Sequence, residues 1–186
     1  NLSELKVKGI IYKILSALEY AYNLEELGGI SHRDIKMENV FISIDKKIKL
    51  GDWGLAAFNV RNRKCKRKCG TKCNYSPQML SEEFYDSNKS DVWALGVMIF
   101  TMITNNRPYQ YDIKLVSENM YSDDWLNKII NKNWESWWKS HEIFSPIIKE
   151  CSLNFKDLIE NMLNPIETER FSLEKVKNHS WFDELK

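Results

Sequence analysis

The sequence has 186 residues, of which 43% are hydrophobic, and it carries 27 basic and 26 acidic residues. This length and apolar content suffice for one compact domain with a buried core, which excludes disorder of the whole chain. Because basic and acidic residues nearly balance, the net charge creates no strong electrostatic field. Neither nucleic acid nor a membrane surface is therefore expected as a partner.

The four cysteines form no obvious disulfide framework, because three of them lie in one short basic segment. We therefore expect a reduced, intracellular and cytoplasmic protein. The apolar runs are too short or too interrupted to span a bilayer, and no leader peptide is expected. The chain begins with Asn1 rather than methionine, which indicates a processed protein or a piece of a longer one.

The first half of the chain predicts one long helix, one hairpin and one long loop. Apolar residues recur at helical spacing up to about residue 26, where a glycine pair at 28–29 is expected to end the helix. The short runs 40–44 and 48–50 are rich in branched residues and predict a small β-hairpin. In residues 52–77 the apolar residues recur at neither helical nor strand spacing, which predicts a long loop. Long loops in compact domains are usually functional.

The second half predicts further helices around a buried one. Residues 91–102 are apolar without a polar face, which predicts a helix buried on nearly all sides at the domain centre. Two further helices are predicted at 123–139 and 153–163, and a last one opens at Ser172 before Trp181. The predicted fold class is mainly α with one hairpin.

The stretch "SHRDIKMENV" at 31–40, between the long helix and the hairpin, is dense in polar groups. Asp34 offers a carboxylate that can accept a proton from an attacking hydroxyl, and Lys36 can hold a phosphate oxygen as a point charge. The Asn39 amide and the Asp52 carboxylate, just past the hairpin in "LGDWGLA", are hard oxygen ligands that suit Mg²⁺. Together these groups predict phosphoryl transfer.

These motifs resemble those of the eukaryotic protein kinases. "HRDIKMEN" followed by "DWG", with Asp34 and Asp52 18 positions apart, resembles the catalytic loop and the metal-binding loop of that family. The further matches are Gly70 and Thr71, "SPQ" at 76–78 where the family has Ala-Pro-Glu, "DVWALG" at 91–96, Arg170, and "HSWF" at 179–182. The resemblance therefore runs along the whole chain.

The resemblance implies the carboxyl-terminal lobe (C-lobe) of a serine/threonine protein kinase over residues 1–186, mainly α with a small β-hairpin. It implies a catalytic loop at 32–39, a metal loop at 52–54 and a long activation segment at 52–78. The chain opens where the first long helix of this lobe would begin. The amino-terminal lobe (N-lobe) of a kinase is therefore expected to be absent from this chain.

The resemblance also implies roles for single residues. Asp34 would be the catalytic base and Lys36 the phosphate contact, while Asn39 and Asp52 would bind Mg²⁺. Thr71, together with Lys36, is similar to the serine/threonine type rather than the tyrosine type. The implied cofactors are ATP and Mg²⁺, and the implied substrate is a protein.

Further roles concern the surroundings of the nucleotide and the loop. Phe41 would form the floor beneath the adenine of ATP. Asp91 would hydrogen-bond the backbone of the catalytic loop, in which His32 is interpreted as a packed structural histidine. Met98 and Met102 could continue the apolar column beneath the adenine or simply fill the core.

Two features depart from the family. Gln78 replaces the glutamate that normally pairs with an arginine, here Arg170, which predicts a weaker, neutral-to-charged contact. Residues 55–70 contain no serine, threonine or tyrosine, so Arg33 cannot receive a phosphate from them. The basic run at 61–68 could only receive an anion from elsewhere, which predicts an acidic substrate or partner; a solvated loop is the alternative.

Two clusters have more than one interpretation. Cys65, Cys69 and Cys73 could be redox-sensitive beside so many cations, or ordinary loop cysteines, whereas a zinc site would need a fourth ligand. The tryptophans between positions 125 and 138 could stack on bases, although their helical spacing favours packing or a docking surface.

Two functions follow from the sequence. The first is transfer of the ATP γ-phosphoryl group to a protein hydroxyl when an N-lobe completes this lobe, favoured by the intact base, lysine and metal ligands. The second is a catalytically silent kinase-like lobe that acts as a binding or structural module. Gln78 and the absence of a phosphorylation site from residues 55–70 favour the second.

Overall fold

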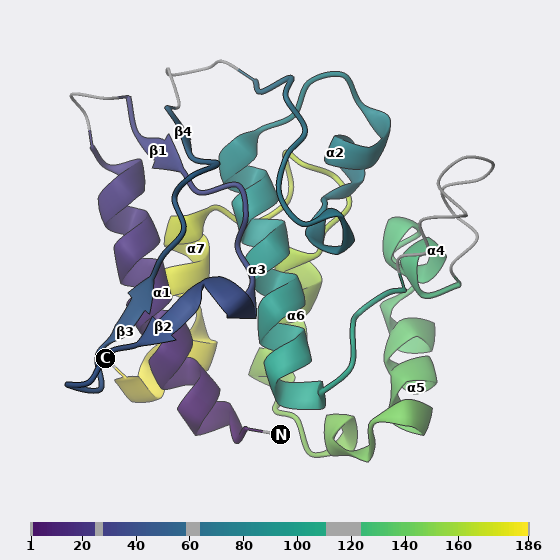
Figure 1. The fold of residues 1–186 in the computed structure, drawn as a ribbon. Helices are drawn as coiled ribbons and strands as arrows, with labels where there is room; N and C mark the ends of the chain where they lie inside the picture. The colour runs from purple at the N-terminus through teal and green to yellow at the C-terminus, as the bar shows by residue number, and fades with distance from the viewer. Residues whose placement is uncertain (1, 25–27, 59–63, 111–123, 186) are drawn as a thin grey trace.

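The computed structural model describes residues 2–24, 28–58, 64–110 and 124–185, and the fold is mainly helical. The helices are α1 (Glu4–Tyr22), α2 (Pro77–Ser81), α3 (Ser87–Thr104), α4 (Asp124–Ile130), α5 (Trp134–Phe144), α6 (Leu153–Met162) and α7 (Leu173–Lys177). The strands are β1 (Ile30–Ser31), β2 (Val40–Ile42), β3 (Ile48–Leu50) and β4 (Ala57–Phe58). Figure 1 shows α3 at the centre, with α1 and the β2–β3 hairpin to one side and α4 and α5 to the other. No described helix is both long and apolar enough to cross a membrane.

Helix α3 confirms the buried helix predicted at 91–102 and extends it at both ends. Asp86 caps its start, because its side chain accepts hydrogen bonds from two backbone N–H groups of the first turn. The helix ends at Thr104, and Asn105, whose φ of 57° is left-handed, caps it. Gly96 lets α3 approach α6 closely, because an added Cβ would lie 3.0 Å from the Cβ of Met162.

Helix α1 ends at Tyr22, earlier than the end predicted near residue 26. The chain folds back against the helix end, where the N–H of Gly29 donates to the carbonyl of Leu24 (2.9 Å). Gly29 has a φ of 81°, and a Cβ there would lie 2.5 Å from the carbonyl oxygen of Tyr22. Gly29 therefore permits a close approach of the chain to the end of the helix, which is already capped at Asn23.

The short elements follow the prediction in part. Strands β2 and β3 form the predicted antiparallel hairpin, but β2 ends at Ile42, two residues early, because the Ser43 hydroxyl donates to the carbonyl of Lys47 and closes the turn. The antiparallel pair of β1 and β4 was not predicted, since two-residue strands show no period. Helix α2 was also missed, although Ser76 as cap and Pro77 in the first turn are a helix-start signal.

The single helix predicted at 123–139 is wrong, because two helices, α4 and α5, occupy this part of the chain. The break comes at Lys132, whose φ is 53°, and at Asn133, whose side chain accepts a hydrogen bond from the N–H of Ser136 and caps α5. Asparagine competes for the backbone in this way and favours a new helix start over a continuous helix. Residue 123 lies outside the described part of the chain.

Trp137 and Trp138 of α5 confirm the packing interpretation, whereas Trp125 and Trp134 are only partly buried against the core. Trp137 and Trp138 are buried, and their rings lie 5.1 and 6.0 Å from the ring of Phe100. The indole N–H of Trp137 donates to the carbonyl of Pro108, and that of Trp138 donates to the carboxylate of Glu160. Because both rings are enclosed in the core, neither can stack on a base.

The two last predicted helices are confirmed. Each begins at a serine whose hydroxyl accepts a backbone hydrogen bond: Ser152 from Phe155 in α6, and Ser172 from Lys175 in α7. Trp181, just beyond α7, is buried and its ring lies 5.9 Å from that of Phe155. The carboxyl-terminal end therefore packs against the same core as α3.

Candidate active site

The polar stretch at 31–40 is fixed by a buried carboxylate on α3. Asp91 accepts hydrogen bonds from the backbone N–H groups of His32 (2.7 Å) and Arg33 (2.8 Å), as predicted. Its side chain lies in the core, where the residue is 1% exposed. Burial raises the pKa of Asp91, and the two hydrogen bonds oppose that rise. The stretch is thus tied to the central helix through its backbone.

Tyr22 is a positioning residue that the sequence reasoning missed. Its hydroxyl donates to the carboxylate of Asp91 at 2.9 Å. Burial, and then the negative charge of Asp91, raise the pKa of Tyr22 well above its usual value, so the hydroxyl keeps its proton at neutral pH. The contact joins residues 69 positions apart, and in the sequence Tyr22 is only one more member of an apolar helix face.

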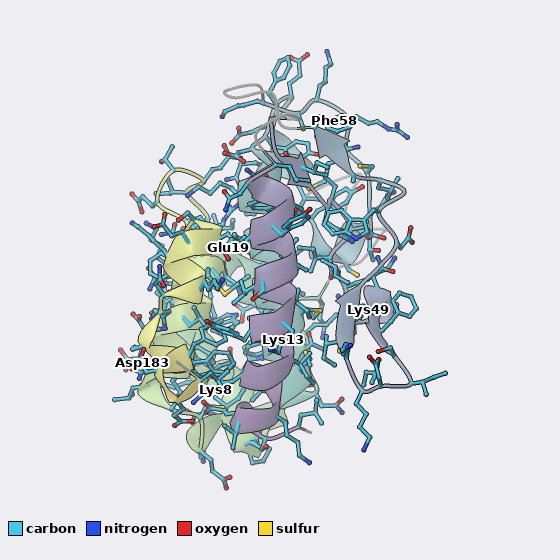
Figure 2. The ribbon with its side chains drawn as sticks, turned by 90° about the vertical axis from the view of Figure 1, so that its left-hand side faces the viewer. Lys8, Lys13, Glu19, Lys49, Phe58 and Asp183 are labelled. Carbon is cyan, nitrogen blue, oxygen red and sulfur yellow. The ribbon has the colours of Figure 1, made fainter. Side chains whose placement is uncertain are left out.

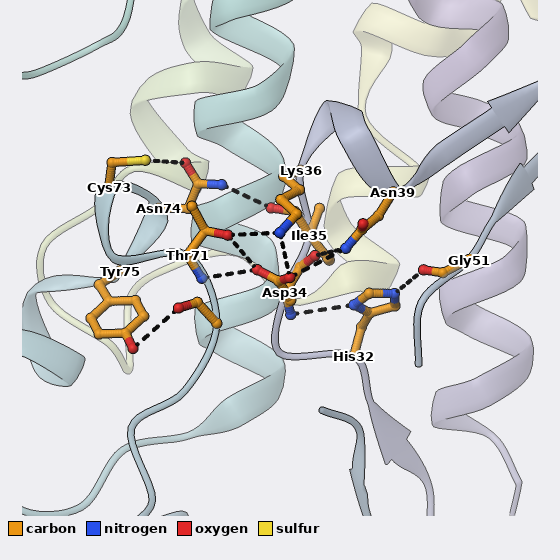
Figure 3. Close-up of polar contacts among 11 residues, drawn as sticks. His32, Asp34, Ile35, Lys36, Asn39, Gly51, Thr71, Cys73, Asn74 and Tyr75 are labelled. Carbon is orange, nitrogen blue, oxygen red and sulfur yellow. Dashed lines mark hydrogen bonds and ion pairs between the residues drawn. The ribbon is translucent and has the colours of Figure 1, made fainter. Parts of the chain in front are cut away.

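Asp34 accepts hydrogen bonds at both carboxylate oxygens, as Figure 3 shows. Thr71 donates its backbone N–H (2.9 Å) and its hydroxyl (2.7 Å) to Oδ1. The ammonium of Lys36 lies 2.7 Å from Oδ2 and also donates to the hydroxyl of Thr71 (3.0 Å). Burial raises the pKa of Asp34, but the bonds from Lys36 and Thr71 outweigh it, so the net pKa is lowered. The carboxylate is therefore ionised at neutral pH.

Gly70 brings Thr71 to Asp34. It has a φ of 96°, and an added Cβ would lie 2.3 Å from the carbonyl oxygen of Arg33. Any other residue would push this segment away from the polar stretch. Glycine is thus needed at position 70, next to Thr71, because the backbone of Arg33 lies too close for a side chain.

Asn39 and Asp52 lie at the same end of the β2–β3 hairpin. The N–H of Gly51 donates to the carbonyl of Asn39 (2.9 Å), which places Asp52 one residue beyond this pairing. The Asn39 amide nitrogen donates to the backbone carbonyl (2.8 Å) and carboxylate (3.3 Å) of Asp34, and no described residue donates to its amide oxygen. The pKa of Lys36 is raised first by its bond to Asp34 and also by the charge of the exposed Asp52. The charge of Asp52 thus acts on Lys36, which is itself paired with Asp34.

The Asn39 amide oxygen and the Asp52 carboxylate fit a hard cation such as Mg²⁺, which takes few protein oxygens and keeps phosphate and water in its other positions. Within residues 2–24, 28–58, 64–110 and 124–185, no three or more His, Cys, Asp or Glu form a group able to hold a metal. Asp52 also has a φ of 56°, and this left-handed conformation of a non-glycine residue is enriched at functional sites.

His32 joins the polar stretch to the residues after β3. Its Nε2 lies 2.9 Å from the carbonyl oxygen of Gly51, and its Nδ1 accepts the N–H of Asp34 (3.3 Å). The imidazole is fully buried, with its ring centroid 4.6 Å from that of Trp53. Trp53 in turn donates its indole N–H to the carbonyl of Leu50 (3.0 Å). These contacts confirm the interpretation of His32 as a packed structural histidine.

Arg33 is held by the chain itself. Its Nε donates to the carbonyl of Leu55 at 2.7 Å, and its backbone has a left-handed φ of 67°. Tyr85 also interacts with Arg33 and donates its hydroxyl to the carbonyl of Arg67 (2.9 Å). Burial raises the pKa of Tyr85 to about 12, so this hydroxyl stays a donor. Where the structure describes them, the residues after Gly54 are thus held by contacts within the chain.

In the described part of the basic run at 61–68, two lysines pair with carboxylates of this chain, and the acidic substrate or partner expected there stays a prediction. The ammonium of Lys64 lies 3.2 Å from the carboxylate of Glu167, and that of Lys66 lies 2.5 Å from that of Glu83. Both carboxylates belong to this chain, and each lies outside the basic run: Glu167 is remote in sequence from Lys64, and Glu83 is 17 positions from Lys66. The first three residues of the run lie outside the described part.

Phe41 stands on β2 with 52% of its surface exposed. Its ring faces Gly51, where an added Cβ would lie 2.7 Å from a ring carbon. Met98 lies in the core and Met102 packs against it, which confirms the core interpretation of both methionines. The adenine floor at Phe41 stays a prediction.

The three loop cysteines, Cys65, Cys69 and Cys73, are unbridged and partly buried. The backbone of Cys65 pairs with that of Tyr85, and the thiol of Cys73 donates to the amide oxygen of Asn74. Their redox sensitivity stays a prediction.

Gln78 makes the predicted contact with Arg170 and one more. Arg170 is 1% exposed and donates to the amide oxygen of Gln78 (2.6 Å), while burial lowers the pKa of this arginine to about 10. The amide nitrogen of Gln78 donates to the carbonyl of Pro165 (2.6 Å), which a glutamate could not do. The substitution therefore exchanges charge pairing for a second hydrogen bond, and the geometry survives.

A buried carboxylate paired with a lysine, with an amide and a second carboxylate on loops near one buried helix, is an arrangement typical of phosphoryl-transfer domains. Comparison with known proteins gives the family: residues 1–182 match the protein kinase domain. The chain belongs to the protein kinase family, as the motifs indicated.

Three relatives illustrate this membership. An Aurora kinase of Candida glabrata is 34% identical over 179 residues, which cover 92% of this chain and 41% of the relative. CBL-interacting serine/threonine-protein kinase 17 of Arabidopsis thaliana is 26% identical over 98% of this chain and 38% of its own length. A probable serine/threonine-protein kinase of Dictyostelium discoideum is 29% identical over 91% of this chain and 18% of its own length. The chain thus spans less than half the length of these relatives.

Proposed function

We propose that this chain is the catalytic lobe of a serine/threonine protein kinase. Completed by an N-lobe, it transfers the γ-phosphoryl group of ATP to a protein hydroxyl. The observation that carries the proposal is the ionised Asp34, held by Thr71 and Lys36 beside the amide of Asn39. All three relatives described above are protein kinases, and two are named as serine/threonine kinases.

In this proposal Asp34 orients the substrate hydroxyl and accepts its proton. Lys36, which bridges Asp34 and Thr71, holds a γ-phosphate oxygen as charge develops on it. Asn39 and Asp52 hold Mg²⁺, which neutralises phosphate charge when it is bound. Phe41, half-exposed on β2, provides the apolar surface beneath the adenine.

One observation favours the alternative, a catalytically silent lobe that serves as a binding or structural module. Both carboxylate oxygens of Asp34 already accept two hydrogen bonds each, from Thr71 on one side and from Lys36 and Asn39 on the other. A substrate hydroxyl must displace one of these donors before Asp34 can act as a base. An acidic partner at the basic run would compete with Glu167 for Lys64 and with Glu83 for Lys66.

A transfer assay separates the two functions. The complete protein is incubated with Mg²⁺ and ATP labelled on its γ-phosphate, together with matched peptides that offer only serine, threonine or tyrosine as acceptor. We expect label on the serine and threonine peptides, none on the tyrosine peptide, and none when Mg²⁺ is chelated. Binding of Mg²⁺–ATP without transfer to any peptide would instead establish the silent module.

A further inference from the structure

A groove runs between α1 and the turn of the β2–β3 hairpin, and it has no part in the site around Asp34. Its volume is about 650 Å³, and its floor is apolar, formed by Leu2, Ile10 and Ile48. Figure 2 shows the hairpin beside the amino-terminal half of α1, with Lys13 on the helix and Lys49 on the hairpin. The groove is therefore an open apolar trough at the end of the hairpin that lies away from Asn39.

Lysines surround this apolar floor. Lys6 and Lys13 line the groove from α1, and Lys46 and Lys47 line it from the hairpin turn. Lys47 pairs with Asp45 at 2.7 Å, whereas no described acidic residue pairs with the other three. A concave surface with one sign of unneutralised charge concentrates ligands of the opposite sign.

We infer that this groove docks an acidic segment of a partner protein that carries apolar side chains. The apolar side chains would lie on the floor, and the carboxylates would meet the ammonium groups of Lys6, Lys13 and Lys46. Apolar burial provides affinity in such a groove, and complementary charge provides orientation and specificity. The floor lies in a hollow between a helix and a turn, which an extended segment can enter and a flat bilayer surface cannot.

The groove holds a natural site for a blocking substitution. Gly9, a half-buried residue of α1, lines the groove, and a Cβ built there meets no atom within 4 Å. Gly9→Leu would therefore fill the groove without disturbing the core, and leucine is a better helix former than glycine. The second variant, Lys6→Glu with Lys13→Glu, reverses the charge of the rim. Lys149→Glu, an exposed lysine at the end of the turn Pro146–Lys149, is the matched charge control.

The test selects peptides from a random displayed library on the immobilised complete protein and then measures the affinity of the selected peptide in solution. We expect peptides that combine acidic and apolar residues. Their affinity should fall at least about tenfold with Gly9→Leu and with the double lysine variant, should fall as salt rises, and should not change with Lys149→Glu.

Three results would overturn the inference. The first is a set of selected peptides without a bias towards acidic residues, and the second is an affinity that Gly9→Leu leaves unchanged. The third is failure to obtain any peptide whose binding depends on the groove, which is expected if another part of the complete protein fills it. Binding of the protein to phosphatidylserine vesicles that Gly9→Leu abolishes, without peptide binding, would assign the groove to a membrane instead. Asp34→Asn should bind the selected peptide as the unaltered protein does, so the result is independent of the proposed catalysis.

Discussion

Replacing Asp34 by asparagine is expected to lower phosphoryl transfer by the complete protein about 10²- to 10⁴-fold. The amide has nearly the shape of the carboxylate and can still accept the hydrogen bonds of Thr71, but it cannot take a proton from the substrate hydroxyl. Lys36 loses its ion pair, yet its side chain is 24% exposed and can turn towards water. The protein should therefore stay folded while losing the reaction.

The measurement compares initial rates at saturating Mg²⁺–ATP, with thermal unfolding of each variant followed by circular dichroism. Asp45→Asn is the matched control, because it makes the same carboxylate-to-amide change at the exposed hairpin turn and should leave the rate unchanged. If Asp34→Asn keeps more than about a tenth of the rate, Asp34 is not the base, since general-base catalysis contributes at least about a hundredfold.

Replacing Asp91 by asparagine is expected to destabilise the protein by about 2–4 kcal/mol. The carboxylate accepts three hydrogen bonds, from the N–H groups of His32 and Arg33 and from the hydroxyl of Tyr22. The amide of an asparagine has one acceptor oxygen, so its NH₂ group would face a donor with no other partner. Tyr22→Phe removes only the hydroxyl and should cost about 1 kcal/mol.

Chemical denaturation followed by tryptophan fluorescence measures both variants. Glu135→Gln is the control, because Glu135 pairs only with the exposed Lys139 among the described residues and should leave the midpoint unchanged. A loss below about 1 kcal/mol for Asp91→Asn would mean that the backbone of His32 and Arg33 finds other acceptors. The anchoring role of the central helix would then be wrong.

Sequence patterns predicted the elements whose cause is local. The apolar run at 91–102 has no polar face, and its burial in α3 follows from that alone. Ser172 marked the start of α7 in the same local way, because its side chain caps that helix. The break between α4 and α5 was missed because Asn133 acts through its side chain, and apolar periodicity does not register a cap.

The residue types of the candidate site were predicted from the sequence. The hydrogen bonds and ion pairs that join these residues were not all predicted. Asp34, Lys36 and Asn39 lie within one short stretch, so their proximity follows from the sequence. Thr71 is 37 positions from Asp34, and only the resemblance to a family joined the two. The bond from Tyr22 to Asp91 and the ion pair of Lys64 with Glu167 had no sequence signal, because tertiary packing alone creates them.

Asn39 and Asp52 are proposed to bind a metal ion beside Asp34. A crystal structure of the complete protein with Mn²⁺ and a non-hydrolysable ATP analogue tests this, because anomalous scattering locates the metal. We expect a peak about 2.1 Å from the amide oxygen of Asn39 and from the carboxylate of Asp52, in contact with the nucleotide phosphates. A metal bound elsewhere, or a bound nucleotide whose phosphates touch neither side chain, would contradict it.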